Sequence, residues 1–260
     1  MATLEERAGA VFEAAPRATT MRAASRYLAI PVFLALILLL LYLYISGRQL
    51  DSIEQRAINR EVITQRTIEH VELTAVSTAA VILIAVPLGI ILTRPGLRRA
   101  TPVFLVLANI GQATPSIGVL VLIAIIWTIG FGPAVVGLVA YATLPILRNT
   151  MVGLEGVDRS MIEAGRGMGM SKMKVLFRIE LPLAVPVILA GIRTALVINV
   201  GTAALAWAVN AGGLGDIIQQ GIALRRDPVL ITGAVLTSGL ALLIDWMAGI
   251  VEDVLRPKGL

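Results

Sequence analysis

Residues 161–182 are the part of the chain whose residue types and spacing could carry chemistry, and they interrupt a very apolar C-terminal region. Glycines at alternate positions from Gly165 to Gly169 precede Lys172, which suggests a phosphate-binding loop. Such a loop ends in Gly-Lys-Ser/Thr, because backbone amides and the lysine together hold the phosphates. Here a serine stands before Lys172 and a methionine after it. The pattern fails, and the sequence predicts no ATP hydrolysis by this chain.

No catalytic or metal-binding constellation is found elsewhere. The chain has no cysteine, which excludes disulfides and thiolate metal sites. His70 is the single histidine, and no G-x-S-x-G motif is present. We therefore expect no catalytic residue and no metal site, and we interpret His70 as a polar residue at a membrane interface.

Local signals predict two short helices within residues 161–182. Ser160 and Glu163 have the spacing of a capping box, so Glu163 could simply hold a helix start. Gly169 can end that helix, and Ser171 can cap the next one. We expect the second helix to stop at Leu181-Pro182.

The same stretch carries many apolar side chains for a polar loop. If exposed, they would form a patch typical of a partner interface, and methionines suit a surface that repacks as its partner moves. The alternative is a loop folded onto the protein's own helices. These side chains are Met161, Ile162, Met168, Met170, Met173, Val175, Leu176 and Phe177.

The chain as a whole has the composition of a multi-pass membrane protein. Hydrophobic residues make up 57%, charged residues 15%, and the mean hydropathy is +0.86. A signal peptide is excluded for the first apolar run by its length and by the lack of a cleavage site. Residues 101–129 are longer than one span requires and contain Pro115, which predicts a broken helix. The six predicted spans are 27–46, 71–93, 101–129, 133–151, 183–209 and 228–251.

The distribution of basic residues predicts the topology. With the N-terminus in the cytoplasm, 15 of the 22 Lys and Arg residues fall on the cytoplasmic side. Positive residues favour that side, so both termini and residues 152–182 are expected to face the cytoplasm. The net charge of +5 therefore reflects membrane topology rather than nucleic-acid binding.

Polar residues inside apolar spans are costly in lipid, so they face a cavity, or they pair with one another. Some surround the break at Pro115 and others fall on the fifth span; a translocation pathway and ordinary helix packing both remain open for them. Arg193 and Asp245 are interpreted as the two buried charges, and we expect a structural ion pair. The candidate pathway residues are Asn109, Gln112, Pro115, Ser116, Asn199, Thr202, Trp207 and Asn210.

The polar stretch matches a known family pattern: E-A-A, three residues, G, nine residues, I, one residue, L-P. It resembles the cytoplasmic coupling loop of permease subunits in bacterial ATP-binding-cassette importers. Gly165 departs from the pattern, since the family usually has alanine there, which lowers helix propensity by roughly 1 kcal/mol. The resemblance implies contact with the ATPase through Glu163, Ala164, Gly165, Gly169, Met170, Ile179, Leu181 and Pro182.

The resemblance covers about residues 69–255, and motifs such as residues 144–150 and 211–216 are similar to the osmoprotectant branch. It implies an all-α polytopic fold of about six transmembrane helices, the type I importer permease fold with a cytoplasmic coupling helix. It also implies import of glycine betaine, carnitine or choline across the bacterial inner membrane. The implied partners are an ATPase dimer that binds ATP and Mg²⁺, an extracytoplasmic binding protein, and a second permease copy or paralogue.

These considerations divide the chain into a tail (1–26), an extra helix (27–46), an extracytoplasmic connector (47–70), a five-helix core (71–255) containing the loop 152–182, and a cytoplasmic C-terminus (256–260). Other small solutes, such as ergothioneine or a methionine-like amino acid, remain open. An ion-coupled secondary transporter would show an internal repeat and an embedded ionisable site, and we see no clear repeat. A membrane anchor without any solute flux is the third alternative.

Overall fold

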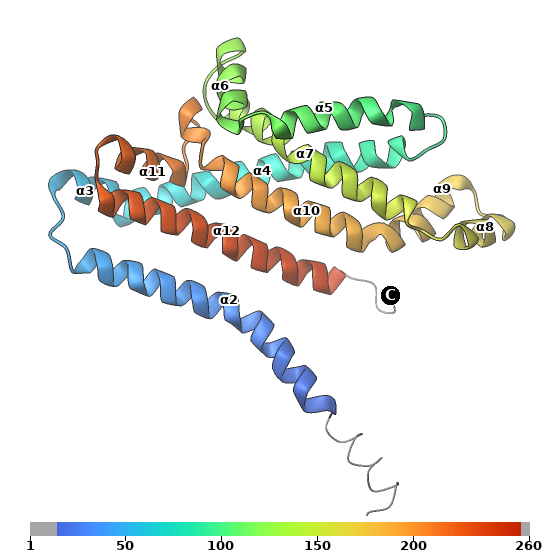
Figure 1. Ribbon diagram of the computed structural model, residues 1–260, viewed down its shortest axis with the longest axis horizontal. Coiled ribbons are helices and arrows are strands. Elements are labelled where there is room, and N and C mark those ends of the chain that lie inside the picture. The colour runs from blue at the N-terminus through green and yellow to red at the C-terminus, as the bar shows by residue number, and fades with distance from the viewer. Residues whose placement is uncertain (1–14, 256–260) are drawn as a thin grey trace, which may run out of the picture.

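The computed structural model describes residues 15–255, which form helices joined by short turns, with no strand among them (Figure 1). The predicted all-α fold is confirmed. The helices are α2 (Ala15–Ser46), α3 (Ser52–Ala57), α4 (Arg60–Leu92), η1 (Arg98–Ala100), α5 (Thr101–Ala113), α6 (Ser116–Ile126), α7 (Phe131–Glu155), α8 (Arg159–Gly167), α9 (Lys172–Val175), η2 (Leu176–Glu180), α10 (Leu181–Ala203), η3 (Ala206–Val209), α11 (Leu214–Ala223) and α12 (Asp227–Leu255).

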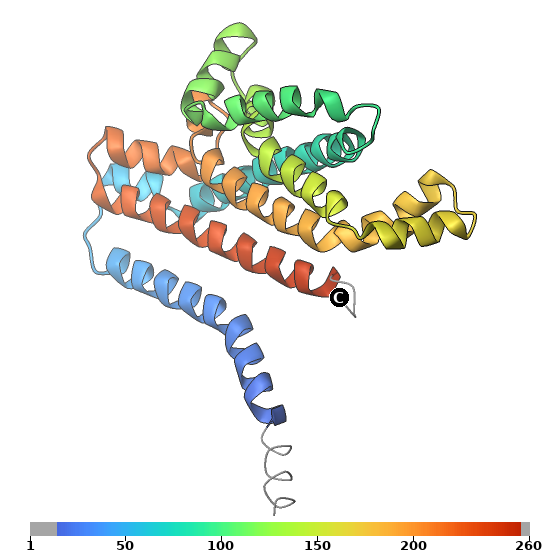
Figure 2. The same ribbon diagram turned by 45° about the vertical axis from the view of Figure 1, so that its right-hand side comes forward.

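Five of these helices are long and apolar enough to cross a membrane, or six spans if one bent pair is counted as a span. The long helices α2, α4, α7, α10 and α12 run along the longest dimension of the molecule (Figures 1 and 2). A bundle of this kind satisfies every backbone hydrogen bond inside lipid, which only helices and closed barrels achieve.

The centre of the bundle consists of α4, α7 and α10, which pack against one another. Leu147 of α7, Val81 of α4 and Ala195 of α10 are fully buried in one core cluster. Gly89 lets α4 approach α7 closely, because a β-carbon there would lie 2.8 Å from Cβ of Thr150. Small residues at such contacts are what membrane helices use in place of a hydrophobic driving force.

The predicted third span is broken at Pro115, and the break is sharper than a kink. The segment Arg98–Ala113 and helix α6 meet at 100°. At 1.5 Å per residue, α5 covers about 20 Å and does not cross a core of about 30 Å by itself. Helix α6 therefore turns away from the bundle direction (Figures 1 and 2).

Three predicted boundaries differ most from the structure. Helix α4 begins at Arg60, so part of the expected connector belongs to a transmembrane helix. Helix α10 ends at Ala203 rather than at Val209, and a separate 3-10 turn follows. Helix α2 begins at Ala15, inside the expected tail (1–26), and residues 1–14 lie outside the described residues.

Helix α2 lies at the edge of the molecule and packs against α12 (Figures 1 and 2). Leu34 is its buried contact, within 3.7 Å of the position that a β-carbon on Gly239 would take. Most of its other large side chains, such as Phe33 and Leu36, are exposed. An apolar helix with one packed edge and an exposed remainder is suited to a lipid environment.

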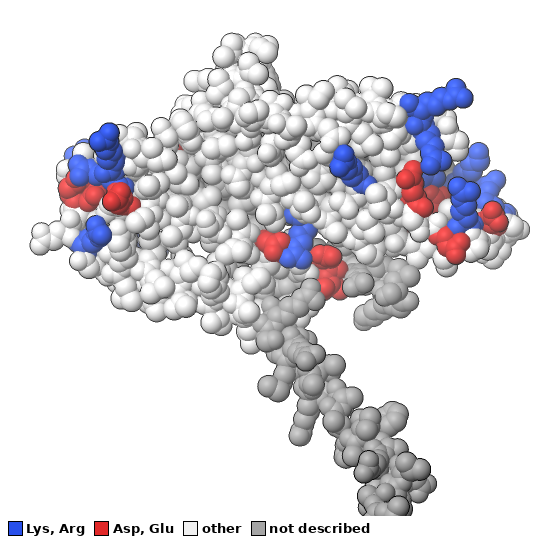
Figure 3. Space-filling model, in the orientation of Figure 1, with Lys and Arg blue, Asp and Glu red and all other residues white. Residues whose placement is uncertain are grey.

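Most charged side chains gather at the two ends of the long dimension, and the region between them is mostly uncharged apart from a small group of basic and acidic side chains (Figure 3). One end carries α3 and α11, and the other carries α8 and α9 (Figures 1 and 3). This distribution matches two polar faces separated by a hydrocarbon layer.

Candidate functional site

The loop between α7 and α10, residues 156–180, lies inside the predicted loop 152–182 and projects beyond the ends of the long helices as α8, α9 and η2 (Figure 1). We call it the coupling loop, after its predicted role. Asp158 caps α8, because its carboxylate accepts a hydrogen bond from the Ser160 backbone N–H at 2.8 Å. This hydrogen bond lowers the pKa of Asp158 below its ordinary value. The capping box expected between Ser160 and Glu163 is therefore wrong, and exposed Glu163 makes no hydrogen bond or ion pair among the described residues.

The predicted end of α8 is confirmed at Gly169, whose φ is +81°. The Met170 N–H donates to the Gly165 carbonyl at 3.1 Å and the Gly169 N–H to the Arg166 carbonyl at 3.0 Å, the pattern of a Schellman motif. Arg166 Nη1 also donates to the Met170 carbonyl at 2.8 Å. Ser171 then caps α9, as predicted, through a 3.3 Å bond from the Lys174 N–H.

The second helix of the loop does not stop at Leu181-Pro182, and this prediction is wrong. It passes through the π-helical turn η2 directly into α10, with the Leu181 N–H donating to the Leu176 carbonyl. Pro182 sits in the first turn of α10, where its missing N–H costs no helical hydrogen bond. Its ring crowds the carbonyl four residues earlier, which favours the wider turn.

Gly165 is buried on the inner face of α8, where it contacts η2. A β-carbon at this position would lie 2.6 Å from Cδ1 of Ile179, and 3.5 Å from both the sulfur of Met170 and Cγ2 of Val175. The alanine that the family usually has at position 165 would therefore require a shift of Ile179, whereas glycine fits. It lets α8 lie directly against the π turn.

The apolar side chains of the coupling loop are of three kinds, and Ile162 and Met170 are half-buried. Val175 and Leu176 are buried inside the protein, as the self-packing alternative expected. Four side chains are half or more exposed, which matches the interface hypothesis, and a groove of about 610 Å³ runs beside Met161, Met168 and Ile179. The exposed group is Met161, Met168, Met173 and Phe177.

Sequence reasoning missed an ion pair behind the loop. Glu180, the last residue of η2, accepts bonds from Arg94 Nη2 at 2.6 Å and Nη1 at 3.2 Å. Glu180 is buried, with 8% of its side chain exposed. The signal in the sequence was a lone acidic residue at the start of an apolar span, opposite a basic turn that follows another span.

The candidate pathway residues do not form one set. Near the Pro115 bend, Asn109 on α5 accepts a 3.1 Å bond from Arg148 on α7. Asn199 on α10 is fully buried and donates to Thr78 on α4 at 3.0 Å, so it joins two helices of the same chain. The others are half-buried Gln112 and Ser116, exposed Pro115, buried Thr202 on α10, Trp207 in η3, and Asn210 in a left-handed turn after η3.

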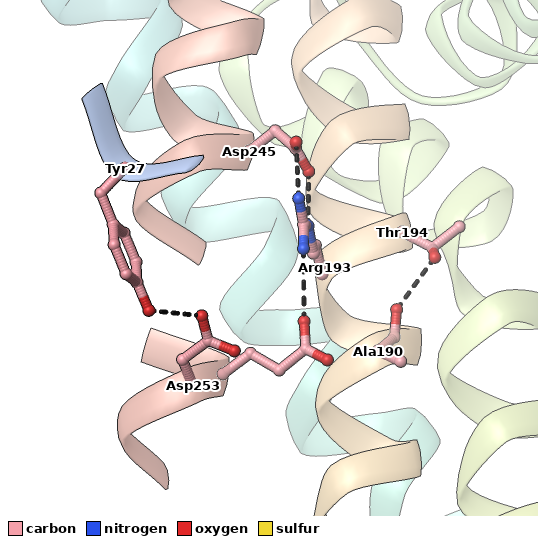
Figure 4. A network of polar contacts seen from close by, with 7 residues as sticks. Tyr27, Ala190, Arg193, Thr194, Asp245 and Asp253 are labelled. Atoms are coloured by element: carbon pink, nitrogen blue, oxygen red, sulfur yellow. Dashed lines mark hydrogen bonds and ion pairs between the residues drawn. The ribbon is translucent and has the colours of Figure 1, made fainter. Parts of the chain in front are cut away.

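The structure brings Arg193 and Asp245 together (Figure 4). Arg193 Nε and Nη2 donate to the two carboxylate oxygens of Asp245 at 2.6 and 2.8 Å, a bidentate geometry that is the strongest form of such a pair. Arg193 Nη1 reaches Glu252 at 3.4 Å. Nearby, the Tyr27 hydroxyl donates to Asp253 at 2.8 Å and thereby links α2 to α12 (Figure 4).

At the end of the molecule away from the coupling loop, polar contacts join the turn before α11 to α4. Arg66 Nη1 lies 2.8 Å from a carboxylate oxygen of Glu69 and of Asp216, and Glu69 accepts from the Gly213 N–H at 3.0 Å. Burial raises the pKa of Asp216; the Arg66 charge opposes this effect and the Glu69 charge adds to it.

His70 is fully buried inside the protein. Its Nε2 lies 3.0 Å from the Val200 carbonyl, so it joins α4 to α10. Among the described residues, no group of three or more His, Asp or Glu side chains is placed to hold a metal ion.

Residues 85–257 match the family described as the binding-protein-dependent transport system inner membrane component. The chain belongs to this family, and it is a permease subunit of the ATP-binding-cassette transporter class.

Curated relatives agree with this assignment. The chain is 39% identical to the choline transport system permease protein OpuBB of Bacillus subtilis, over 75% of this chain and 89% of the relative. It is 41% identical to the osmoprotectant import permease protein OsmY of Salmonella typhimurium, over 82% of this chain and 89% of the relative. It is 38% identical to OsmW of the same organism, over 81% of this chain and all of the relative.

Solved structures show the same fold. A chain of the methionine transporter MetNI in an inward-facing conformation is 29% identical, with a TM-score of 0.67 over 75% of this chain and 96% of that chain. An amino acid transporter crystallised with histidines has a TM-score of 0.65 at 16% identity, over 80% of this chain and all of that chain, and this likeness concerns the fold alone.

Proposed function

We propose that this chain forms the translocation pathway of an ATP-driven importer of small osmoprotectants such as glycine betaine, carnitine or choline. The observation that carries the proposal is the identity of 38–41% to permeases whose names specify choline, glycine betaine, carnitine or osmoprotectant transport. The fold supplies membrane-spanning helices and a projecting loop. A separate binding protein selects the solute. It would hold the quaternary ammonium group in an aromatic cage, which is the usual form of such a site.

ATP hydrolysis falls to a partner ATPase dimer, which supplies the bound ATP and Mg²⁺. The exposed methionines of the coupling loop and the groove beside Met161 and Met168 support contact with that partner. Glu163 is exposed and without a partner in the described part of the chain, so it is available to a neighbouring subunit. A second permease copy or a paralogue completes the pathway.

We place the coupling loop and both termini in the cytoplasm, and the protein in the bacterial inner membrane. The bias of basic residues supports this orientation. The end of the molecule that carries α8 and α9 then faces the ATPase, and the end that carries α3 and α11 faces the binding protein.

A methionine-like amino acid is the second candidate solute. The likeness to the MetNI methionine transporter at 29% identity favours it over other small solutes. The sequence identity to the osmoprotectant permeases is higher, so an osmoprotectant remains the first candidate solute.

Uptake of labelled glycine betaine tests the proposal. The cells lack other betaine importers and express this chain together with its partner ATPase and binding protein. Wild type is compared with Glu163→Ala, and with Glu155→Ala as a matched control. Glu155 is an exposed carboxylate at the same end of the molecule, with only a 3.7 Å contact to Arg98. We expect uptake by wild type and by the control, and a loss of uptake in Glu163→Ala.

Each outcome has a separate meaning. Equal uptake by wild type and Glu163→Ala would contradict the role of the coupling loop. No betaine uptake by wild type, but uptake of labelled methionine, would reassign the solute. Uptake that continues without ATP and collapses with an uncoupler would favour an ion-coupled transporter.

A further inference from the structure

We propose that Arg94 and Glu180 form a positioning pair, which makes α4 follow the coupling loop when the ATPase moves it. The inference rests on the proposed function, and it deepens that function by naming residues that transmit the movement. Glu180 ends the π turn between the loop and α10, and Arg94 lies just beyond the end of α4. The pair is thus located where the loop meets two central helices of the bundle.

The geometry of the pair is that of a fixed contact. Both carboxylate oxygens of Glu180 accept from the guanidinium of Arg94, at 2.6 and 3.2 Å. Arg94 Nε also donates to the Ile90 carbonyl at 3.3 Å, which fastens the guanidinium to the last turn of α4. A planar guanidinium held in this way has one orientation toward the carboxylate, and lysine could not reproduce it.

The pair is needed because of the form of the covalent connection between the loop and α10. The connection is a π turn, with a hydrogen bond from Leu181 to Leu176 in place of the α-helical one. Such turns are rare interruptions of an α-helix and are frequent at functional sites. Without a contact between η2 and α4, the loop could pivot at this turn and at its junction with α7, and leave α4 in place.

The packing on the loop side is continuous up to Glu180. Gly165 of α8 lies against Ile179, the neighbour of Glu180, so α8 and η2 form one packed unit. Movement of α8 is therefore carried to Glu180 and from there to α4. Helix α4 in turn packs on α7 and α10, so the whole central bundle is reached.

Glu155 offers a matched control. It lies in the same polar hollow of about 440 Å³ as Arg94 and Glu180. Its contact with Arg98 is 3.7 Å long, and 46% of its side chain is exposed. Exposed pairs of this kind contribute little, so Glu155→Gln changes a carboxylate at the same place without breaking a fixed contact.

The first experiment measures solute uptake per ATP hydrolysed by the complete transporter in proteoliposomes. We expect Glu180→Gln and Arg94→Gln to retain the ATPase subunit and its basal hydrolysis, and to lose roughly five-fold or more of the uptake per ATP. The exchange Arg94→Glu/Glu180→Arg is expected to recover part of the loss. Glu155→Gln is expected to behave as wild type.

A second readout does not depend on the solute. The chain has no cysteine, so Thr93→Cys places a single thiol at the end of α4. Its labelling rate is measured on this chain, in the full complex, with and without a non-hydrolysable ATP analogue. We expect the nucleotide to change the rate in the otherwise wild-type protein, and this change to shrink roughly five-fold or more in Glu180→Gln.

Several results would overturn the inference. They are unchanged uptake per ATP in both single variants, an equal nucleotide response with and without Glu180→Gln, or no response in the otherwise wild-type protein. Loss of the ATPase subunit from Glu180→Gln would also overturn it, because the pair would then only hold the loop folded. A transporter that takes up no betaine but retains the Glu180-dependent labelling response would refute the solute assignment and support the pair.

Discussion

Gly165 and Ile179 are in direct contact across the coupling loop, and no side chain fits between them without displacement. A β-carbon on Gly165 would lie 2.6 Å from Cδ1 of Ile179. The contact brings α8 against the π turn that leads into α10. It explains why a glycine, a poor helix former, stands inside a nine-residue helix.

Gly165→Ala tests this contact. Alanine gains about 1 kcal/mol of helix propensity, but overpacking costs about 1–3 kcal/mol, and Cδ1 is the mobile end of its side chain. We expect a net loss of at most about 2 kcal/mol of unfolding free energy, seen as a lower melting temperature in detergent. Ile179→Val removes Cδ1, so the double variant should be more stable than the sum of the single effects. Strict additivity would contradict the contact.

Substitutions at Gly169 test the left-handed backbone conformation at this position rather than side-chain packing. Its φ is +81°, and nothing lies within 4 Å of the β-carbon it lacks. The cost of a substitution is therefore conformational, about 1–2 kcal/mol for most residues and less for asparagine. We expect Gly169→Asn to retain uptake and Gly169→Val to lower both uptake and melting temperature. Equal effects of the two variants would show that the left-handed turn is not required.

The membrane fold could be predicted because its signals are local. Apolar length identified the spans, Pro115 identified the break, and Gly169 and Ser171 identified the end and the start of short helices. The angle at Pro115 could not be predicted, because packing of α5 and α6 on α7 sets it. The early end of α10 at Ala203 was also hidden, since the apolar run continues through the next turn.

The site was predictable in its motif and not in its contacts. The coupling-loop pattern located Glu163 and Gly169, but the Asp158 cap was overlooked, because Ser160 and Glu163 have the spacing of a capping box. The pair of Glu180 with Arg94 joins residues 86 positions apart, which no local pattern reveals. The burial of His70 depends on the facing helix in the same way.

The ion pair of Arg193 and Asp245 gives a stability prediction. Asp245→Asn removes one partner of a half-buried bidentate pair, and Glu252 at 3.4 Å is a poor replacement. We expect a clear fall in melting temperature, larger than that of Glu252→Gln. The apolar double variant Arg193→Met/Asp245→Leu should be more stable than Asp245→Asn, because breaking a pair costs more than replacing it. A larger loss in Glu252→Gln would contradict this ranking.

Asp216 predicts a dependence of stability on pH. Burial raises the pKa of this carboxyl above its ordinary value of 3.8, against the opposing charge of Arg66. The folded protein therefore holds the proton more tightly than the unfolded chain, so the unfolding free energy falls as pH rises from the unfolded pKa through the folded pKa. At pH values above the folded pKa, Asp216 is ionised in the folded protein, and the unfolding free energy is reduced by the full cost of burying its charge.

Asp216→Asn removes this cost. We expect the variant to melt at a higher temperature than wild type at neutral pH, and the difference to shrink as the pH falls through the raised pKa of Asp216 and to vanish near the ordinary value. Melting curves across this pH range measure the effect. Gln220→Ala, an exposed uncharged position on the same helix, serves as the control. A variant that melts at a lower temperature than wild type at neutral pH, with a deficit that disappears toward low pH, would mean that the Arg66 contact at 2.8 Å outweighs the burial of Asp216.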